Sequence, residues 1–113
     1  MHEVGLMQNA VDLAIEAAAR QRAGRIHRLT LRVGALAGVE PGALEFAFEV
    51  VVAGTIAEGA RLVVESAAVI CFCQLCGREF EPAGAVFECP RCGEVSRDVR
   101  RGYELELASL EVS

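Results

Sequence analysis

The segments Cys71-Phe-Cys-Gln-Leu-Cys76 and Cys89-Pro-Arg-Cys92, separated by twelve residues, decide how this chain is organised. Cys73 and Cys76 form one Cys-x-x-Cys pair, and Cys89 and Cys92 form the second. Two such pairs at about this separation are typical of knuckles that close one tetrahedral metal site. The sequence therefore predicts that the four cysteines bind a single metal ion.

The residues around the cysteines fit such knuckles. A chain that wraps a metal must reverse after its second sulfur, and Gly77 and Gly93 can adopt the positive φ angles that this requires. Four thiolates favour a soft or borderline cation and leave no open position, so structural zinc is the expected occupant. Iron in a rubredoxin-like site is an alternative. A disulfide framework is another, although five cysteines leave one unpaired.

Composition indicates a small soluble protein. Its 113 residues suffice for one core, and no apolar run reaches the roughly 20 residues of a membrane span. The N-terminus lacks the basic and apolar regions of a signal peptide, so we expect a cytoplasmic protein that does not bind membranes. A formal charge of -5 argues against nucleic acid as a partner. The cluster Arg97, Arg100 and Arg101 is interpreted as a solvated loop or a contact surface for an acidic protein.

Apolar periodicity predicts two helices. Residues 4–22 repeat apolar side chains at steps of three and four, and Gly24 lies where a C-terminal cap is expected. Residues 41–53 begin with Pro41 and are apolar over most of the circumference, with Glu45 and Glu49 as a narrow polar stripe. A helix of this kind is either deeply covered or held against a partner.

Three strands are predicted, over residues 25–33, 61–70 and 102–112. His27 has the parity of the apolar face of the first strand, and we interpret it as a strand-end residue that is packed or hydrogen-bonded locally rather than as a metal ligand. In the third strand Tyr103, Leu105 and Leu107 share a face, and the alternation shifts before Leu110, which predicts a bulge or a bend.

The chain is thus predicted to leave a sheet near Ile70, form the metal knot and return to the sheet near Tyr103. The expected fold class is α+β, with two helices packed on a three-stranded sheet and an inserted zinc-ribbon-like knot of four cysteines. Residues 1–69 and 102–113 would form one domain, and residues 70–101 a zinc-binding domain. No phosphate-binding glycine loop, catalytic triad or nucleophile elbow is present, so we do not expect an enzyme.

A second candidate metal site lies at the N-terminus, Met1-His2-Glu3. The terminal amine, the His2 imidazole and the amide nitrogen between them can bind one ion in fused chelate rings. Nitrogen donors near one plane suit Ni(II) or Cu(II) better than zinc. The Glu3 carboxylate is close enough to serve as a further ligand or as an acceptor for a ligand's hydrogen bond.

These two sites occur together with several further segments: Arg32-Val-Gly-Ala-Leu36, Gly38-Val-Glu-Pro41, Glu45-Phe-Ala-Phe48 and Ala57-Glu-Gly-Ala-Arg-Leu62. The combination resembles the HypA/HybF family of hydrogenase maturation proteins over essentially the whole chain. The resemblance implies a metallochaperone that delivers nickel to the apo large subunit of [NiFe]-hydrogenase with a HypB-type GTPase. In some organisms the family also serves urease, so urease accessory proteins are further candidate partners.

The resemblance also implies roles for particular residues. His2 matches the family's nickel-anchoring histidine, Glu3 its acidic neighbour, and Glu40 an acidic position by the nickel site. The four paired cysteines match the ligands of structural Zn(II), whereas Ni(II) is the transported ion. Cys71 is interpreted as a buried spectator, with ligand exchange as the alternative.

Two other functions stay open at this point: a zinc-ribbon interaction module that transports no metal, and a rubredoxin-like electron carrier. The oligomeric state is expected to be monomer or homodimer.

Overall fold

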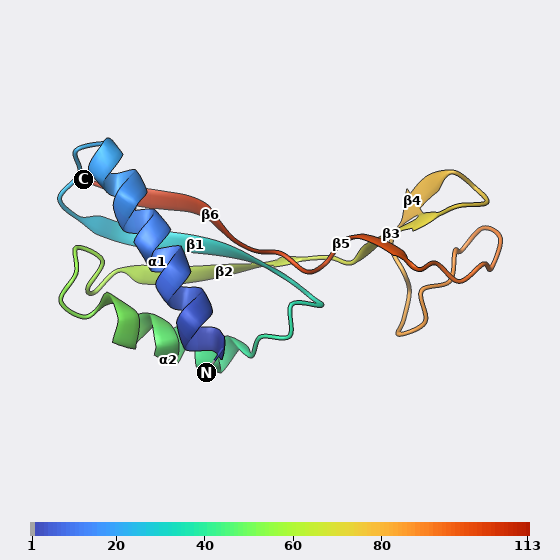
Figure 1. The fold of residues 1–113 in the computed structure, drawn as a ribbon, viewed down its shortest axis with the longest axis horizontal. Coiled ribbons are helices and arrows are strands. Elements are labelled where there is room, and N and C mark those ends of the chain that lie inside the picture. Colours follow the sequence, from blue (N-terminus) through green and yellow to red (C-terminus); the bar gives the residue numbers. More distant parts are fainter. Residues whose placement is uncertain (1) are drawn as a thin grey trace. The chain divides into compact units, whose positions relative to one another are not determined.

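The computed structural model describes residues 2–113, and of His2 only the backbone. In chain order the elements are α1 (His2–Arg20), β1 (Ile26–Gly34), α2 (Pro41–Val52), β2 (Arg61–Ala67), β3 (Ile70–Cys73), β4 (Arg78–Phe80), β5 (Asp98–Arg101) and β6 (Leu105–Val112). The strands form two sheets of three, in the orders β2-β1-β6 and β4-β3-β5 (Figure 1). The predicted α+β class, with two helices and a three-stranded sheet beside a four-cysteine cluster, is confirmed.

Contacts divide the chain into two compact units. The first unit comprises residues 1–32, 38–65 and 105–113, and the second comprises residues 33–37 and 66–104. The first holds both helices and most of the β2-β1-β6 sheet, and the second holds the β4-β3-β5 sheet with all five cysteines. Each candidate metal site named from the sequence therefore belongs to a different unit.

The core of the first unit lies between α1, α2 and the central strand β1. Helix α1 packs against α2 and β6, and Met7, Val11, Leu29 and Leu31 are fully buried. Backbone hydrogen bonds join Arg25 to Ser113 and Gly34 to Glu104, so β1 and β6 run antiparallel. The buried positions of α1 recur at helical spacing, as the periodicity predicted.

The ends of α1 differ from the sequence prediction. The helix begins at His2 and ends at Arg20, rather than spanning residues 4–22. Arg22 has φ 56°, Ala23 N–H donates to Ala18 O at 2.9 Å, and Arg22 N–H donates to Ala19 O at 3.0 Å. This pair of bonds is a Schellman cap, with Arg22 in the left-handed position that glycine usually occupies. The prediction that Gly24 caps the helix was wrong, because the chain turns two residues earlier.

Helix α2 begins as predicted and has both covered and open faces. Pro41 occupies its first turn, and Glu40 is its N-cap, whose Oε2 accepts a hydrogen bond from Ala43 N–H at 2.6 Å. Four of its side chains are buried: Leu44, Ala47, Phe48 and Val52. Phe46, in contrast, is 70% exposed, so the helix is not deeply covered all round within the described residues.

The predicted second and third strands are shorter than expected. Strand β2 ends at Ala67, and β3 begins at Ile70 as part of the other sheet, so residues 61–70 are not one strand. Strand β6 starts at Leu105, and Tyr103 is 64% exposed instead of sharing a covered face with the leucines. Both Leu107 and Ala108 are half-buried, so the burial alternation changes phase where the sequence placed an irregularity.

The sheet of the second unit was not predicted from the sequence. Its central strand β3 pairs antiparallel with β4, with Cys71 opposite Phe80, and with β5, with Cys71 opposite Val99. Two of its strands contain four residues and one contains three, which is too short for a period-two pattern to stand out. The prediction of a knot without a sheet was therefore incomplete.

No helix among the described residues is long and apolar enough to cross a membrane.

Candidate metal centre

The four paired cysteines come from two turns of the second unit. Cys73 is the last residue of β3, and Cys76 lies in the turn that leads to β4. Cys89 and Cys92 lie in a second turn, which a bridge between Glu88 and Val95 closes. Both predicted knuckles are therefore present as chain reversals, one of them anchored directly by the sheet.

The sulfurs of these cysteines form one group. All four Sγ atoms lie within 4.8 Å of one another, with Cys73 to Cys92 at 3.6 Å and Cys76 to Cys89 at 3.9 Å. Metal–sulfur bonds of about 2.3 Å in a tetrahedron place neighbouring sulfurs about 3.8 Å apart. The donor set therefore fits a single four-coordinate ion with no position left for water or substrate.

Backbone hydrogen bonds hold each knuckle. Gly77 N–H donates to Cys73 O and Gly93 N–H donates to Cys89 O, both at 2.8 Å. The two glycines have φ 67° and φ 79°, a region that side chains rarely adopt, as the sequence predicted. Cys76 N–H also points at the Cys73 sulfur, at 3.4 Å. These bonds hold the two knuckles through the backbone in the arrangement that brings the four sulfurs together.

The cysteine side chains influence one another electrostatically. Backbone N–H groups of Cys92 and Arg91 lower the pKa of Cys89 to about 7. Hydrogen bonding to the Cys92 side chain, together with burial, raises the pKa of Cys76 to about 12. Four thiolates this close repel one another unless a cation lies among them, so metal binding should release protons.

The fifth cysteine, Cys71, is fully buried on the same face of β3 as Cys73. It does not belong to the group of four sulfurs, and burial raises its pKa. It therefore has the position predicted for a buried spectator. None of the five cysteines forms a disulfide, so the disulfide framework is not found among the described residues.

Two of the three clustered arginines, Arg100 and Arg101, lie in a strand, although the sequence predicted a loop or a contact surface. The strand is β5, which corrects the loop part of the prediction. Arg100 forms two bonds with Asp98, at 2.9 and 3.0 Å, and its guanidinium lies 4.1 Å from the centre of the Phe72 ring. The pair lowers the pKa of Asp98. The contact with Phe72 joins β5 to β3, the strand that carries Cys73.

The predicted nickel residues lie at the N-terminal ends of α1 and α2 in the first unit. Met1 and the His2 side chain lie outside the described residues, and Glu3 is in the first turn of α1. Glu40 caps α2 with one carboxylate oxygen. A proline in a first helical turn signals the capping position before it, so this role of Glu40 could have been found from the sequence.

Among the side chains that the structure describes, only the four cysteines group as three or more potential ligands. His27 is exposed, and its Nε2 lies 2.6 Å from Ser113 Oγ. His27 is hydrogen-bonded, as one of the two interpretations held, but it is exposed rather than packed on the apolar face, and its partner lies 86 residues along the chain rather than nearby in sequence. Within this described set, neither Glu3 nor Glu40 belongs to a group of three or more potential ligands.

Comparison with known proteins identifies the family. A model of the family described as "Hydrogenase/urease nickel incorporation, metallochaperone, hypA" matches residues 1–112. The chain belongs to the HypA family.

Relatives of similar length agree with this assignment. The chain is 49% identical over 112 residues to the hydrogenase maturation factor HypA of Picosynechococcus, with 99% of each chain covered. It is 41% identical to the HypA of Chloroflexus aurantiacus, with 98% of each chain covered. The protein is thus a nickel metallochaperone of hydrogenase maturation and not an enzyme.

Solved structures share the fold. The solution structure of the Ni metallochaperone HypA from Helicobacter pylori has a TM-score of 0.74 at 24% identity, covering 97% of this chain and 96% of that one. A second solution structure of a HypA protein has a TM-score of 0.77 at 26% identity, covering 100% of this chain and 97% of that one.

The family assignment excludes the two alternative functions for the whole chain: the rubredoxin-like electron carrier and the zinc-ribbon interaction module that transports no metal.

Proposed function

We propose that this metallochaperone holds two different ions in its two units. Zn(II) occupies the four-cysteine cluster permanently, and Ni(II) binds at the N-terminus through the Met1 amine, the intervening amide and His2. Glu3 and Glu40 serve as acidic neighbours of the nickel. The observation that supports this division is the closed group of four sulfurs, which fits one tetrahedral ion and leaves no donor atom for a second ion.

The chemistry of the two donor sets supports different roles. Four thiolates bind zinc strongly enough for folding of the second unit to depend on the ion. An imidazole and an amine, with reference pKa values of about 6.5 and 8, compete with protons for their metal. A carrier needs such an exchangeable site, because it must both collect its ion and release it.

The acidic residues would add to nickel affinity in different ways. Glu3 lies in the first turn of α1, one residue after the proposed histidine ligand. Glu40 already uses Oε2 to cap α2, which leaves Oε1 for a metal or for a ligand's hydrogen bond. We therefore assign Glu40 to the surroundings of the nickel rather than to its primary donors.

The proposed clients follow from the family's role in hydrogenase and urease nickel incorporation. We propose delivery to the apo large subunit of a [NiFe]-hydrogenase in the cytoplasm, assisted by a HypB-type GTPase. Urease accessory proteins are a further class of client partner. We propose the chain as monomer or homodimer in this cycle.

Calorimetry on the chain with its natural N-terminus tests the nickel site. His2→Ala should weaken nickel binding at least about 100-fold, because both the imidazole and its chelate ring are lost. The matched control is His27→Ala, which removes the chain's other histidine and should leave the affinity unchanged. Unchanged nickel affinity in His2→Ala would refute the proposed site.

Metal analysis tests the identity of the other ion. The purified chain should contain one zinc per molecule and be colourless, whereas ferric iron in four thiolates is coloured. A coloured protein with one iron per chain and no zinc would contradict the zinc assignment and leave the nickel site unaffected.

A further inference from the structure

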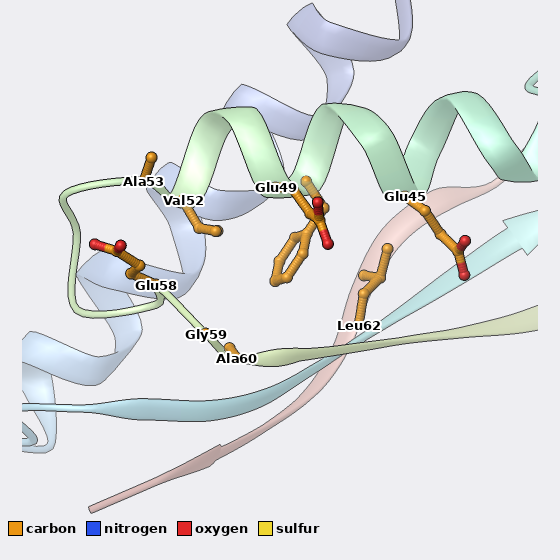
Figure 2. A pocket seen from close by; sticks show the side chains of 9 residues that line it. Glu45, Glu49, Val52, Ala53, Glu58, Gly59, Ala60 and Leu62 are labelled. Carbon is orange, nitrogen blue, oxygen red and sulfur yellow. The ribbon is translucent and has the colours of Figure 1, made fainter.

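An acidic groove runs along α2 in the first unit and contains none of the residues assigned to either metal. Helix α2 forms one wall, the start of β2 lies opposite, and the loop of residues 53–60 closes one end (Figure 2). Its volume is about 460 Å³. Three carboxylates and three apolar side chains define this α2 groove: Glu45, Glu49, Glu58, Phe48, Val52 and Leu62.

None of the three groove carboxylates forms an ion pair within the described residues, although the Arg25 guanidinium lies at the closed end, where it donates a hydrogen bond to Glu58 O at 2.9 Å. Residues 33–60 contain four glutamates and no basic residue. Glu58 Oε1 accepts a hydrogen bond from Gly54 N–H at 2.9 Å. A bound segment that supplies basic side chains would therefore meet, at Glu45 and Glu49, two carboxylates that form no ion pair within the described residues.

These glutamates are unfavourable for the helix itself. Glu45 and Glu49 are four residues apart, where like charges destabilise a helix by about 0.2–0.5 kcal/mol. Glu49 also lies in the last turn of α2, at the negative end of the helix dipole, and that turn has no basic residue. A local pattern that opposes helix stability is expected where a binding function requires it.

Exposed apolar side chains extend the surface beyond the groove. Phe46 is 70% exposed and Val50 is 53% exposed, and each follows one of the two glutamates in sequence. The outer face of α2 thus carries an acidic stripe beside an apolar stripe. Exposed aromatic side chains are frequent anchors of protein interfaces, and they also attract cations over their ring faces.

The closed end of the groove is formed in advance. Thr55 Oγ1 donates to Val52 O at 2.7 Å and accepts from Ala57 N–H at 3.0 Å. Gly54 and Gly59, with φ 78° and φ 79°, allow the tight loop that these bonds hold. A rigid groove loses little conformational entropy when it is filled.

We propose that the α2 groove docks a basic amphipathic segment of a partner protein. Lysine or arginine side chains of the segment lie against Glu45, Glu49 and Glu58, and an apolar side chain lies against Phe48 and Leu62. A second copy of this chain is a poorer occupant, because a symmetric contact would bring the same carboxylates together. The proposal does not depend on where nickel binds.

The test uses a synthetic amphipathic peptide of leucine and lysine, and a twin in which glutamate replaces every lysine. The lysine peptide should shift amide resonances of α2 and residues 53–62 in the full chain, and the glutamate twin should not. Its dissociation constant should rise about fivefold in the double variant Glu45→Gln/Glu49→Gln at low salt, as expected for two exposed ion pairs.

A matched double variant separates docking from general attraction to an acidic protein. Asp12→Asn/Glu111→Gln changes the net charge by the same amount at two exposed positions outside the groove and should bind the peptide like the original chain. Nickel affinity should be unchanged in both double variants, which separates this proposal from the proposed function.

Three results with the peptide would overturn the docking proposal. They are an absence of binding by the lysine peptide, an equal loss of affinity in the matched double variant, and resonance shifts confined to other surfaces. Sedimentation of the peptide-free chain supplies a further outcome. A dimer that Glu45→Gln/Glu49→Gln alters would make a second copy the occupant and would also overturn the proposal.

Discussion

The two candidate metal sites differ in how much of the polypeptide forms them. In the second unit, backbone hydrogen bonds and two left-handed glycines bring four sulfurs within 4.8 Å of one another. At the N-terminus the proposed donors are the first two residues of the chain, and the nearby element is simply the first turn of α1. A closed four-thiolate site whose folding is coupled to metal binding suits retention, whereas donors at a chain end suit exchange.

The largest expected effect tests the closed site. Cys89→Ala should abolish zinc binding and unfold the second unit, because structural zinc supplies on the order of 10 kcal/mol of folding free energy. Zinc content and the amide spectrum would measure this. Cys71→Ala is the matched control: it should keep one zinc and cost about 1 kcal/mol, since Cys71 is buried but lies outside the sulfur group.

If Cys71→Ala loses zinc while Cys89→Ala keeps it, the assignment of the four ligands is wrong. That result would also give Cys71 the role in ligand exchange that the sequence left open.

Acidification should separate the two sites next. Protons compete with nickel for the imidazole and the amine, whose reference pKa values are about 6.5 and 8. Below each pKa, the nickel affinity should fall about tenfold per pH unit for that group, because nickel must displace its proton. Zinc should stay bound over the same range, between about pH 7 and 6. Equilibrium dialysis with both metals measures the two releases, and zinc leaving before nickel would reverse the proposed roles.

Two substitutions of Glu40 distinguish its role as the N-cap of α2 from its proposed role near the nickel. Glu40→Ala should lower the stability of the first unit by about 1 kcal/mol, because Ala43 N–H loses its acceptor. Glu40→Gln keeps an acceptor oxygen and should stay close to the original stability. If Glu40 supports nickel through its charge, both variants lose the same nickel affinity. Denaturant unfolding and calorimetry make this comparison, and full affinity in both would remove Glu40 from the site.

The smallest effect concerns the far end of α1. Arg22→Gly should stabilise the first unit by about 0.5–1 kcal/mol, since glycine adopts φ 56° without a steric penalty. Affinities for both metals should stay the same, because the cap is at the other end of α1 from His2. A changed nickel affinity would mean that the N-terminal site depends on the whole helix and is less open than proposed.

Sequence reasoning succeeded where local chemistry decides the structure. The spacing of the four cysteines and the glycines after each pair predicted the cluster, because a knuckle needs only a few neighbouring residues. The core face of α1 followed from periodicity. The left-handed Arg22 did not, since any residue but glycine is unfavourable there and Gly24 lay nearby as a better candidate.

Features that depend on pairing between distant segments were missed. Strand β3 is only four residues long, and its role as the centre of a sheet comes from partners at residues 78–80 and 98–101. The contact between Arg100 and Phe72 likewise joins two strands far apart in the chain. Short sequence patterns do not reveal pairing between distant strands. The sequence therefore predicted the metal-binding knot but not the sheet that supports it.

X-ray absorption at the nickel and zinc edges tests the division between the two sites most directly. The chain with its natural N-terminus, loaded with one equivalent of each metal, should show nitrogen and oxygen around nickel and four sulfurs around zinc. Sulfur in the nickel shell, with His2→Ala leaving that shell unchanged, would contradict the account.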